Sequence, residues 1–120
     1  MIAILFVQLF FLRYSNRMDK FFHLKVEFFR YRALSIAGVA ARGGAGIQSD
    51  LKKFQELDVY GMSAITAIVA THPETKQGVF PQSFDAIEAQ LYTIERDIGV
   101  DAVKTGMLFT EEVITNVAKI

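Results

Sequence analysis

The chain has 120 residues, enough for one domain with a buried core, and 52% of them are hydrophobic. Its 13 basic and 13 acidic residues balance, which argues against a nucleic-acid partner. The lack of cysteine excludes disulfides and thiolate metal sites, and the two histidines, at positions 23 and 72, form no recognisable metal motif. We therefore expect a cytoplasmic globular protein without a metal site.

Residues 1–32 form an N-terminal extension of unclear status. Met1–Leu12 is almost wholly apolar but too short to span a bilayer, which takes about 20 residues. Basic residues follow this run, whereas a signal peptide places them before it. Three interpretations stay open: an extra strand or disordered extension, a weak membrane-surface anchor, or a translation artefact ahead of the true start. We assign no function to this extension.

A regular pattern begins at Ala33. The short apolar run Ala33–Ala37 predicts a buried strand that ends at Gly38. Glycines at positions 43, 44 and 46 then interrupt regular structure and permit positive φ angles. Apolar residues at helical spacing predict a helix from Ile47 to Leu57, and the apolar run Met62–Ala70 predicts a strand covered on both faces.

The second half of the chain continues the alternation. Val79–Phe80 is a candidate short strand, and residues 83–99 predict a helix with Ser83 as N-cap and Gly99 at its end. Ala102–Thr105 predicts a third core strand, in which Lys104 is expected to meet a carbonyl or carboxylate. Thr110 is expected to cap a last helix. Strands alternating with helices indicate an α/β protein with a parallel sheet.

The glycine loop at residues 43–46 matches neither common phosphate-binding motif. Ser49 stands where a dinucleotide fingerprint needs a third glycine or an alanine, and no Gly-Lys-Ser/Thr closes a P-loop. The residues alone leave a tight turn and a ligand-contacting loop both open. Asp50 follows on the inward flank of the predicted helix, where a carboxylate needs partners. It either stabilises a first helical turn or binds a ligand.

Four sequence blocks, in order, carry a resemblance from Ala33 to Ile120. They are ALSIAG at 33–38, GGAGIQSDLKKFQ at 43–55, YGMSAITAIVA at 60–70 and DAVKTGML at 101–108. Together they resemble the N-terminal half of the hydroxymethylpyrimidine/phosphomethylpyrimidine kinases, in the pyridoxine kinase-like branch of the ribokinase-like superfamily. The resemblance implies a three-layer α/β fold with a mostly parallel sheet, truncated after its N-terminal half.

The resemblance implies ATP-dependent phosphorylation of hydroxymethylpyrimidine and its monophosphate in thiamine biosynthesis. The alternative within the family is a pyridoxine or pyridoxal kinase of vitamin B6 salvage. An alternative of another class is a non-catalytic interaction or membrane-associated protein on a degenerate kinase scaffold. The resemblance also implies a homo-oligomer for the full-length members of the family. Their ATP, Mg²⁺ and catalytic-base sites lie in the C-terminal half, so we expect no catalytic residue in this chain and no activity from it alone.

The resemblance also implies substrate-binding residues. Asp50 matches an aspartate that hydrogen-bonds substituents of the pyrimidine or pyridine ring. Val69 and Met107 would lie against the two faces of that ring, a role suited to apolar and polarisable side chains. Gly38 and Thr71 match further pocket positions.

Two positions depart from the family pattern. Thr71 and His72 stand where pyrimidine kinases commonly have glutamine and asparagine, which leaves the choice of substrate open. Val39–Arg42 replaces a small hydroxyl residue, an aspartate and a small residue before the glycine pair, and adds a cation. We expect His72 to face solvent, because lone loop histidines seldom carry chemistry.

Overall fold

The computed structural model describes residues 31–74 and 76–119, so nearly all of the N-terminal extension lies outside the described residues. Within the described ranges, no helix has the length and apolar character needed to cross a bilayer. The elements, in chain order, are β1 Arg32–Ala40, α2 Gly46–Glu56, β2 Tyr60–Val69, β3 Val79–Pro81, α3 Phe84–Asp97, β4 Ala102–Thr105 and α4 Glu111–Val117.

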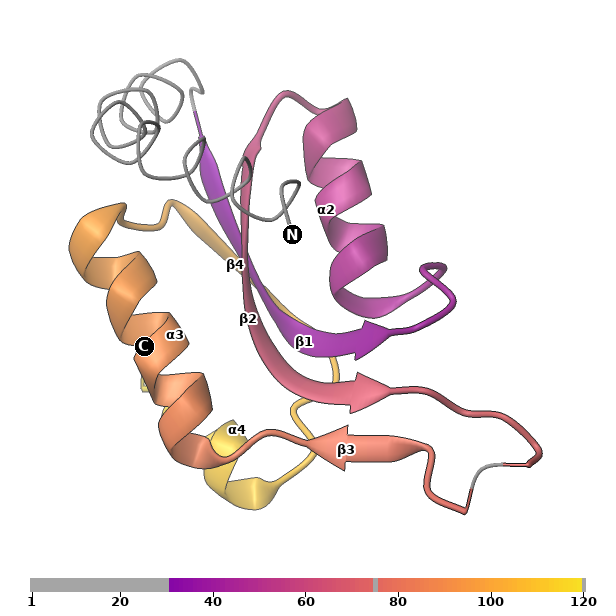
Figure 1. The fold of residues 1–120 in the computed structure, drawn as a ribbon. Coiled ribbons are helices and arrows are strands. Elements are labelled where there is room, and N and C mark those ends of the chain that lie inside the picture. Colours follow the sequence, from indigo (N-terminus) through magenta and orange to yellow (C-terminus); the bar gives the residue numbers. More distant parts are fainter. Residues whose placement is uncertain (1–30, 75, 120) are drawn as a thin grey trace, which may run out of the picture.

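The strands form one sheet in the order β3-β2-β1-β4 (Figure 1). β1 runs parallel to β2 and to β4, whereas the short β3 is antiparallel to β2. Helix α2 covers one face of this sheet, and α3 and α4 lie on the other (Figure 1). The predicted α/β class, the mostly parallel sheet and the three layers are therefore confirmed.

The central position of β1 explains its burial. Leu34 and Ile36 point to the α3 side and pack in one core cluster with Ile94. The opposite face meets α2 closely: an ideal Cβ added to Gly61 of β2 would lie 3.0 Å from the side chains of Leu51 and Phe54. A glycine at this position therefore lets α2 pack tightly against the sheet.

The predicted helix boundaries are mostly confirmed by capping geometry. Ser83 Oγ accepts a hydrogen bond from the Ala86 backbone N–H at 3.3 Å, and Thr110 Oγ1 accepts one from Val113 at 3.2 Å. Gly99, just past α3, has φ +79°, as a C-terminal glycine should.

Two expectations are wrong in detail, those for the end of the first strand and for the strand Ala102–Thr105. β1 does not end at Gly38 but continues to Ala40, because β2 pairs with it that far. The strand Ala102–Thr105 forms but is exposed along its length, because among the described strands it pairs only with β1. A core strand needs neighbours on both sides, and β4 lies at the sheet edge.

An ion pair fixes the start of β1 against the start of β4. The Arg32 guanidinium donates to both carboxylate oxygens of Asp101, at 2.8 and 3.0 Å, and the Arg32 backbone N–H donates to the same carboxylate at 2.7 Å. The side-chain and backbone hydrogen bonds from Arg32 lower the pKa of Asp101 to about 2. This contact begins the folded unit one residue before the expected Ala33.

We expect Asp101→Asn to destabilise the fold in a pH-dependent way. A carboxylate whose folded pKa is depressed stabilises above its unfolded pKa, about 3.9, and that contribution is lost as pH falls through the folded pKa near 2. The melting temperatures of the wild type and the variant should thus differ at pH 6 and converge between about pH 4 and 2. A difference that stays constant over this range would contradict the assignment.

Candidate functional site

Three of the predicted site residues meet at the carboxyl end of the sheet. An ideal Cβ on Gly38 would lie 2.8 Å from the Met107 Cε and 3.6 Å from a Val69 methyl group. Thr66 Oγ1 donates to the Met107 carbonyl oxygen at 2.6 Å, which fixes the segment after β4 against β2. Gly38 therefore provides the space into which Met107 fits, and Val69 lies beside both.

Asp50 lies on the other side of the sheet, in the second turn of α2. Its Oδ2 accepts a hydrogen bond from Ser35 Oγ of β1 at 2.6 Å and one from Lys104 Nζ of β4 at 2.7 Å. Its side chain is 18% exposed. Because α2 has no acidic residue in its first turn, the interpretation of Asp50 as a first-turn residue is wrong. The expected carboxylate partner of Lys104 is confirmed.

The surroundings keep Asp50 charged. Burial raises its pKa, but the hydrogen bonds from Lys104 and Ser35 and the positive charge of Lys104 lower it, with a net lowering. Both of these hydrogen bonds go to Oδ2, and Oδ1 has no hydrogen-bond partner within the described part of the chain. The site therefore presents an ionised oxygen with room for a further donor.

The face of the sheet that carries Asp50 and the face that carries Met107 are linked by two pairs of chain neighbours, Ala37–Gly38 of β1 and Gly106–Met107 after β4. An ideal Cβ on Gly106 would lie 2.7 Å from the Ala37 Cβ and 3.3 Å from Lys104 Nζ. Ala37 and Gly106 thus touch on the Lys104 side, whereas their chain neighbours Gly38 and Met107 approach on the other. Both halves belong to one region at the end of β1 and β4.

Thr71 lies farther out, in a cavity of about 520 Å³ lined by residues 40–42, 44–45 and 69–72. Val69 also lines this cavity, and its other walls are largely aliphatic or backbone. Asp50 and Met107 are not among its lining residues, so the structure brings Val69 and Thr71 into one hollow and leaves Asp50 and Met107 outside it.

The glycine loop is held by side chains of α2. The Gln48 amide accepts from the Ala40 N–H at 3.0 Å and donates to the Ala40 carbonyl at 2.8 Å, and Lys52 Nζ donates to the Gly43 carbonyl at 3.1 Å. Gln48 and Lys52 thus fix the loop although the expected hydroxyl and aspartate are replaced. His72 is exposed, as expected, and it also lines this cavity.

Sequence reasoning missed Ser35 as a partner of Asp50. A hydroxyl inside the apolar run of β1 could have identified it, because Ser35 is fully buried and a buried hydroxyl needs a hydrogen-bond partner.

The described residues show no metal site. Residues 31–74 and 76–119 contain no group of three or more His, Asp or Glu side chains that could hold an ion.

Residues 41–120 match the family model of phosphomethylpyrimidine kinase. Over 91 residues the chain is 56% identical to a pyridoxine kinase of Bacillus subtilis, and over 89 residues 49% identical to a hydroxymethylpyrimidine/phosphomethylpyrimidine kinase of the same organism. These matches cover 74% of this chain but 34% and 33% of the relatives, so the chain spans about a third of their length.

Solved structures of vitamin kinases are also similar to this chain. The last common ancestor of HMPPK and PLK/HMPPK vitamin kinases superposes with a TM-score of 0.71 at 63% identity, covering 74% of this chain and 42% of that one. The pyridoxal kinase from Staphylococcus aureus, in complex with AMP-PCP and pyridoxal, gives 0.69 at 50% identity and covers 74% of this chain and 33% of that one.

Proposed function

Since the chain belongs to the phosphomethylpyrimidine kinase family, we propose that it forms the ring-binding part of an ATP-dependent kinase that phosphorylates a hydroxymethyl group on a substituted pyrimidine. The observation that carries this proposal is that Gly38, Val69 and Met107 meet at the carboxyl end of a parallel sheet, with the ionised Asp50 on the other face near the same end. Ligands of open α/β sheets bind at that edge.

In this proposal each residue has a physical role. Val69 and Met107 contact the flat ring, and Gly38 leaves the space for them to do so. Asp50 Oδ1 accepts a hydrogen bond from an amino or hydroxyl substituent of the ring, because Oδ2 is already engaged. Thr71 contacts the ring at the outer cavity.

ATP and Mg²⁺ belong to the proposal as the phosphoryl donor system. A relative from Staphylococcus aureus is solved with AMP-PCP and pyridoxal, which supports nucleotide use. Since the described residues offer no cluster of metal ligands, we assign Mg²⁺ no ligand in this chain and no step of phosphoryl transfer to its side chains.

A second candidate substrate is the pyridine ring of pyridoxine or pyridoxal. One observation favours it: the identity to the Bacillus subtilis pyridoxine kinase, 56%, exceeds that to the pyrimidine kinase, 49%. The test below compares both rings.

We expect kinase activity when residues 33–120 replace the matching first third of the Bacillus subtilis pyridoxine kinase. ADP release in a coupled assay should then depend on hydroxymethylpyrimidine or pyridoxine, and the ratio of the two kcat/KM values would identify the preferred ring. The unmodified kinase is the control. A folded hybrid that releases ADP at the same rate with and without either ring would refute the proposed function.

A further inference from the structure

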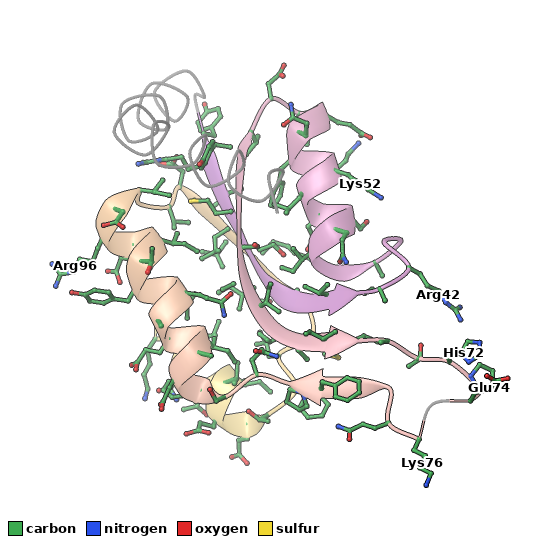
Figure 2. All side chains as sticks on the ribbon, viewed as in Figure 1. Arg42, Lys52, His72, Glu74, Lys76 and Arg96 are labelled. Atoms are coloured by element: carbon green, nitrogen blue, oxygen red, sulfur yellow. The ribbon has the colours of Figure 1, made fainter. Side chains whose placement is uncertain are left out.

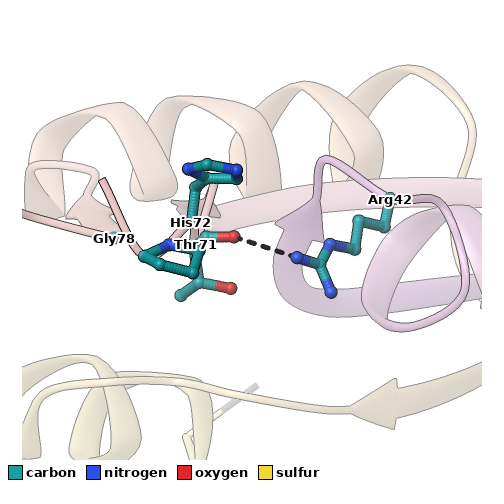
Figure 3. A pocket seen from close by; sticks show the side chains of 5 residues that line it. Arg42, Thr71, His72 and Gly78 are labelled. Atoms are coloured by element: carbon teal, nitrogen blue, oxygen red, sulfur yellow. Dashed lines mark hydrogen bonds between the residues drawn. The ribbon is translucent and has the colours of Figure 1, made fainter. Parts of the chain in front are cut away.

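Arg42 lines two neighbouring hollows. The cavity that Val69 lines and a smaller hollow of about 320 Å³ share Arg42, Thr71 and His72 as lining residues. Figure 3 shows these three residues around the smaller hollow. The larger hollow is mostly aliphatic and suits a flat ring, whereas the smaller one is open to solvent and has the guanidinium at its side. A ligand seated in the first can therefore extend a substituent to Arg42.

The guanidinium has spare hydrogen-bonding capacity. It donates one long hydrogen bond, 3.5 Å, to the Thr71 carbonyl oxygen (Figure 3). Across the described ranges its side chain has no carboxylate partner within ion-pair distance. Since a guanidinium carries five N–H donors in a planar fork, Arg42 can bind an anionic group through two parallel bonds.

The neighbouring groups favour an anion at this place. Arg42, His72 and Lys76 lie on the two loops at the same end of the molecule, together with the carboxylate of Glu74 (Figure 2). His72 lines the same hollow, and its Nδ1 accepts a hydrogen bond from the Glu74 backbone N–H at 3.2 Å. Lys52 adds positive charge at the glycine loop.

We propose that Arg42 forms an anion subsite that makes the cavity prefer a phosphate ester of the ring ligand over the neutral alcohol. The inference rests on the proposed function, because a kinase of this class converts the ring alcohol into a phosphate ester. Arginine binds phosphate bidentately and keeps its charge at all working pH values. Through Arg42, the site would therefore retain the phosphorylated ring.

Equilibrium dialysis of the 120-residue chain tests this with four probes: pyridoxine, pyridoxine 5′-phosphate, inorganic phosphate and ADP. We expect the ester to bind about five- to tenfold more tightly than the alcohol, with a preference that shrinks as salt rises. Arg42→Ala should abolish the preference by weakening the binding of the ester to that of the alcohol, and Arg42→Lys should restore part of it. Arg96→Ala is the matched control, because Arg96 lies on α3 over Tyr92, far from the cavity.

The outcomes separate the two proposals. Equal binding of alcohol and ester, or a preference that survives Arg42→Ala, overturns the anion subsite while the proposed function stands. Inorganic phosphate or ADP binding as tightly as the ester shows that the ring contributes nothing, and this also overturns it. If neither ring compound binds to folded protein, the subsite and the proposed function fail together. Circular dichroism confirms that each variant is folded.

Discussion

Gly46→Ala is expected to lose roughly 2–4 kcal/mol of folding free energy, the largest stability loss we expect from a single methyl group in this chain. Gly46 has φ +63°, a conformation that alanine adopts only with strain. An ideal Cβ there would also lie 2.1 Å from the Gly38 carbonyl oxygen, which belongs to the backbone of the central strand. The loop and α2 would have to move away from β1.

Urea unfolding followed by circular dichroism measures the effect. Gly44→Ala is the matched control, since an ideal Cβ on Gly44 meets no atom within 4 Å and its φ is not positive. Its midpoint should change little, whereas that of Gly46→Ala should fall sharply, because small domains are stable by only about 5–15 kcal/mol. Equal midpoints would show that the loop tolerates a side chain next to Gly38.

Asp50→Ala is expected to raise the KM for the ring substrate about ten- to a hundredfold in the hybrid kinase. Loss of one charge-assisted hydrogen bond in a partly buried site costs roughly 1.5–3 kcal/mol of binding. The carboxylate would touch the ring in the ground state and in the transition state alike, so kcat should change less. Asp50→Asn should be milder, because its amide oxygen still accepts a hydrogen bond.

A double variant separates substrate binding from a purely structural role. Asp50 is the ion-pair partner of Lys104, so a high KM could reflect an unpaired Lys104 alone. If so, adding Lys104→Met to Asp50→Ala should return KM to the wild-type value. If Asp50 binds the ring, KM should stay high. Asp97→Ala, at the exposed end of α3, controls for the loss of a negative charge.

Local sequence signals determined most of the secondary structure. Apolar spacing predicted the helices and strands, because a helix or strand that buries one side repeats its apolar residues at its own period. Hydroxyl residues at 83 and 110 predicted two helix starts, since their oxygens satisfy backbone N–H groups only three residues away. These interactions join residues close in sequence and can be read without knowing the fold.

The sequence also indicated the family and, through it, a list of candidate residues. It did not indicate how these residues are arranged. Asp50 was singled out as a carboxylate in need of partners, but Ser35 and Lys104 could not be assigned to it, because 15 and 54 positions separate them from it. The role of Arg42 likewise depends on the loop that follows β2, which local pattern does not place beside it.

The tertiary structure alone decided which residues meet at the site and which strand is exposed. Strand order places β4 beside β1 at the edge of the sheet that the described strands form, which exposes Ala102–Thr105 and brings Lys104 beside Ser35, from where it reaches Asp50. The same packing brings Gly46 against Gly38 and Met107 over Gly38. Periodicity in the sequence indicates which face of a helix or strand is apolar. The neighbours of that helix or strand are set by the packing of all elements together. The sequence alone therefore determined the elements, and the tertiary structure determined the site.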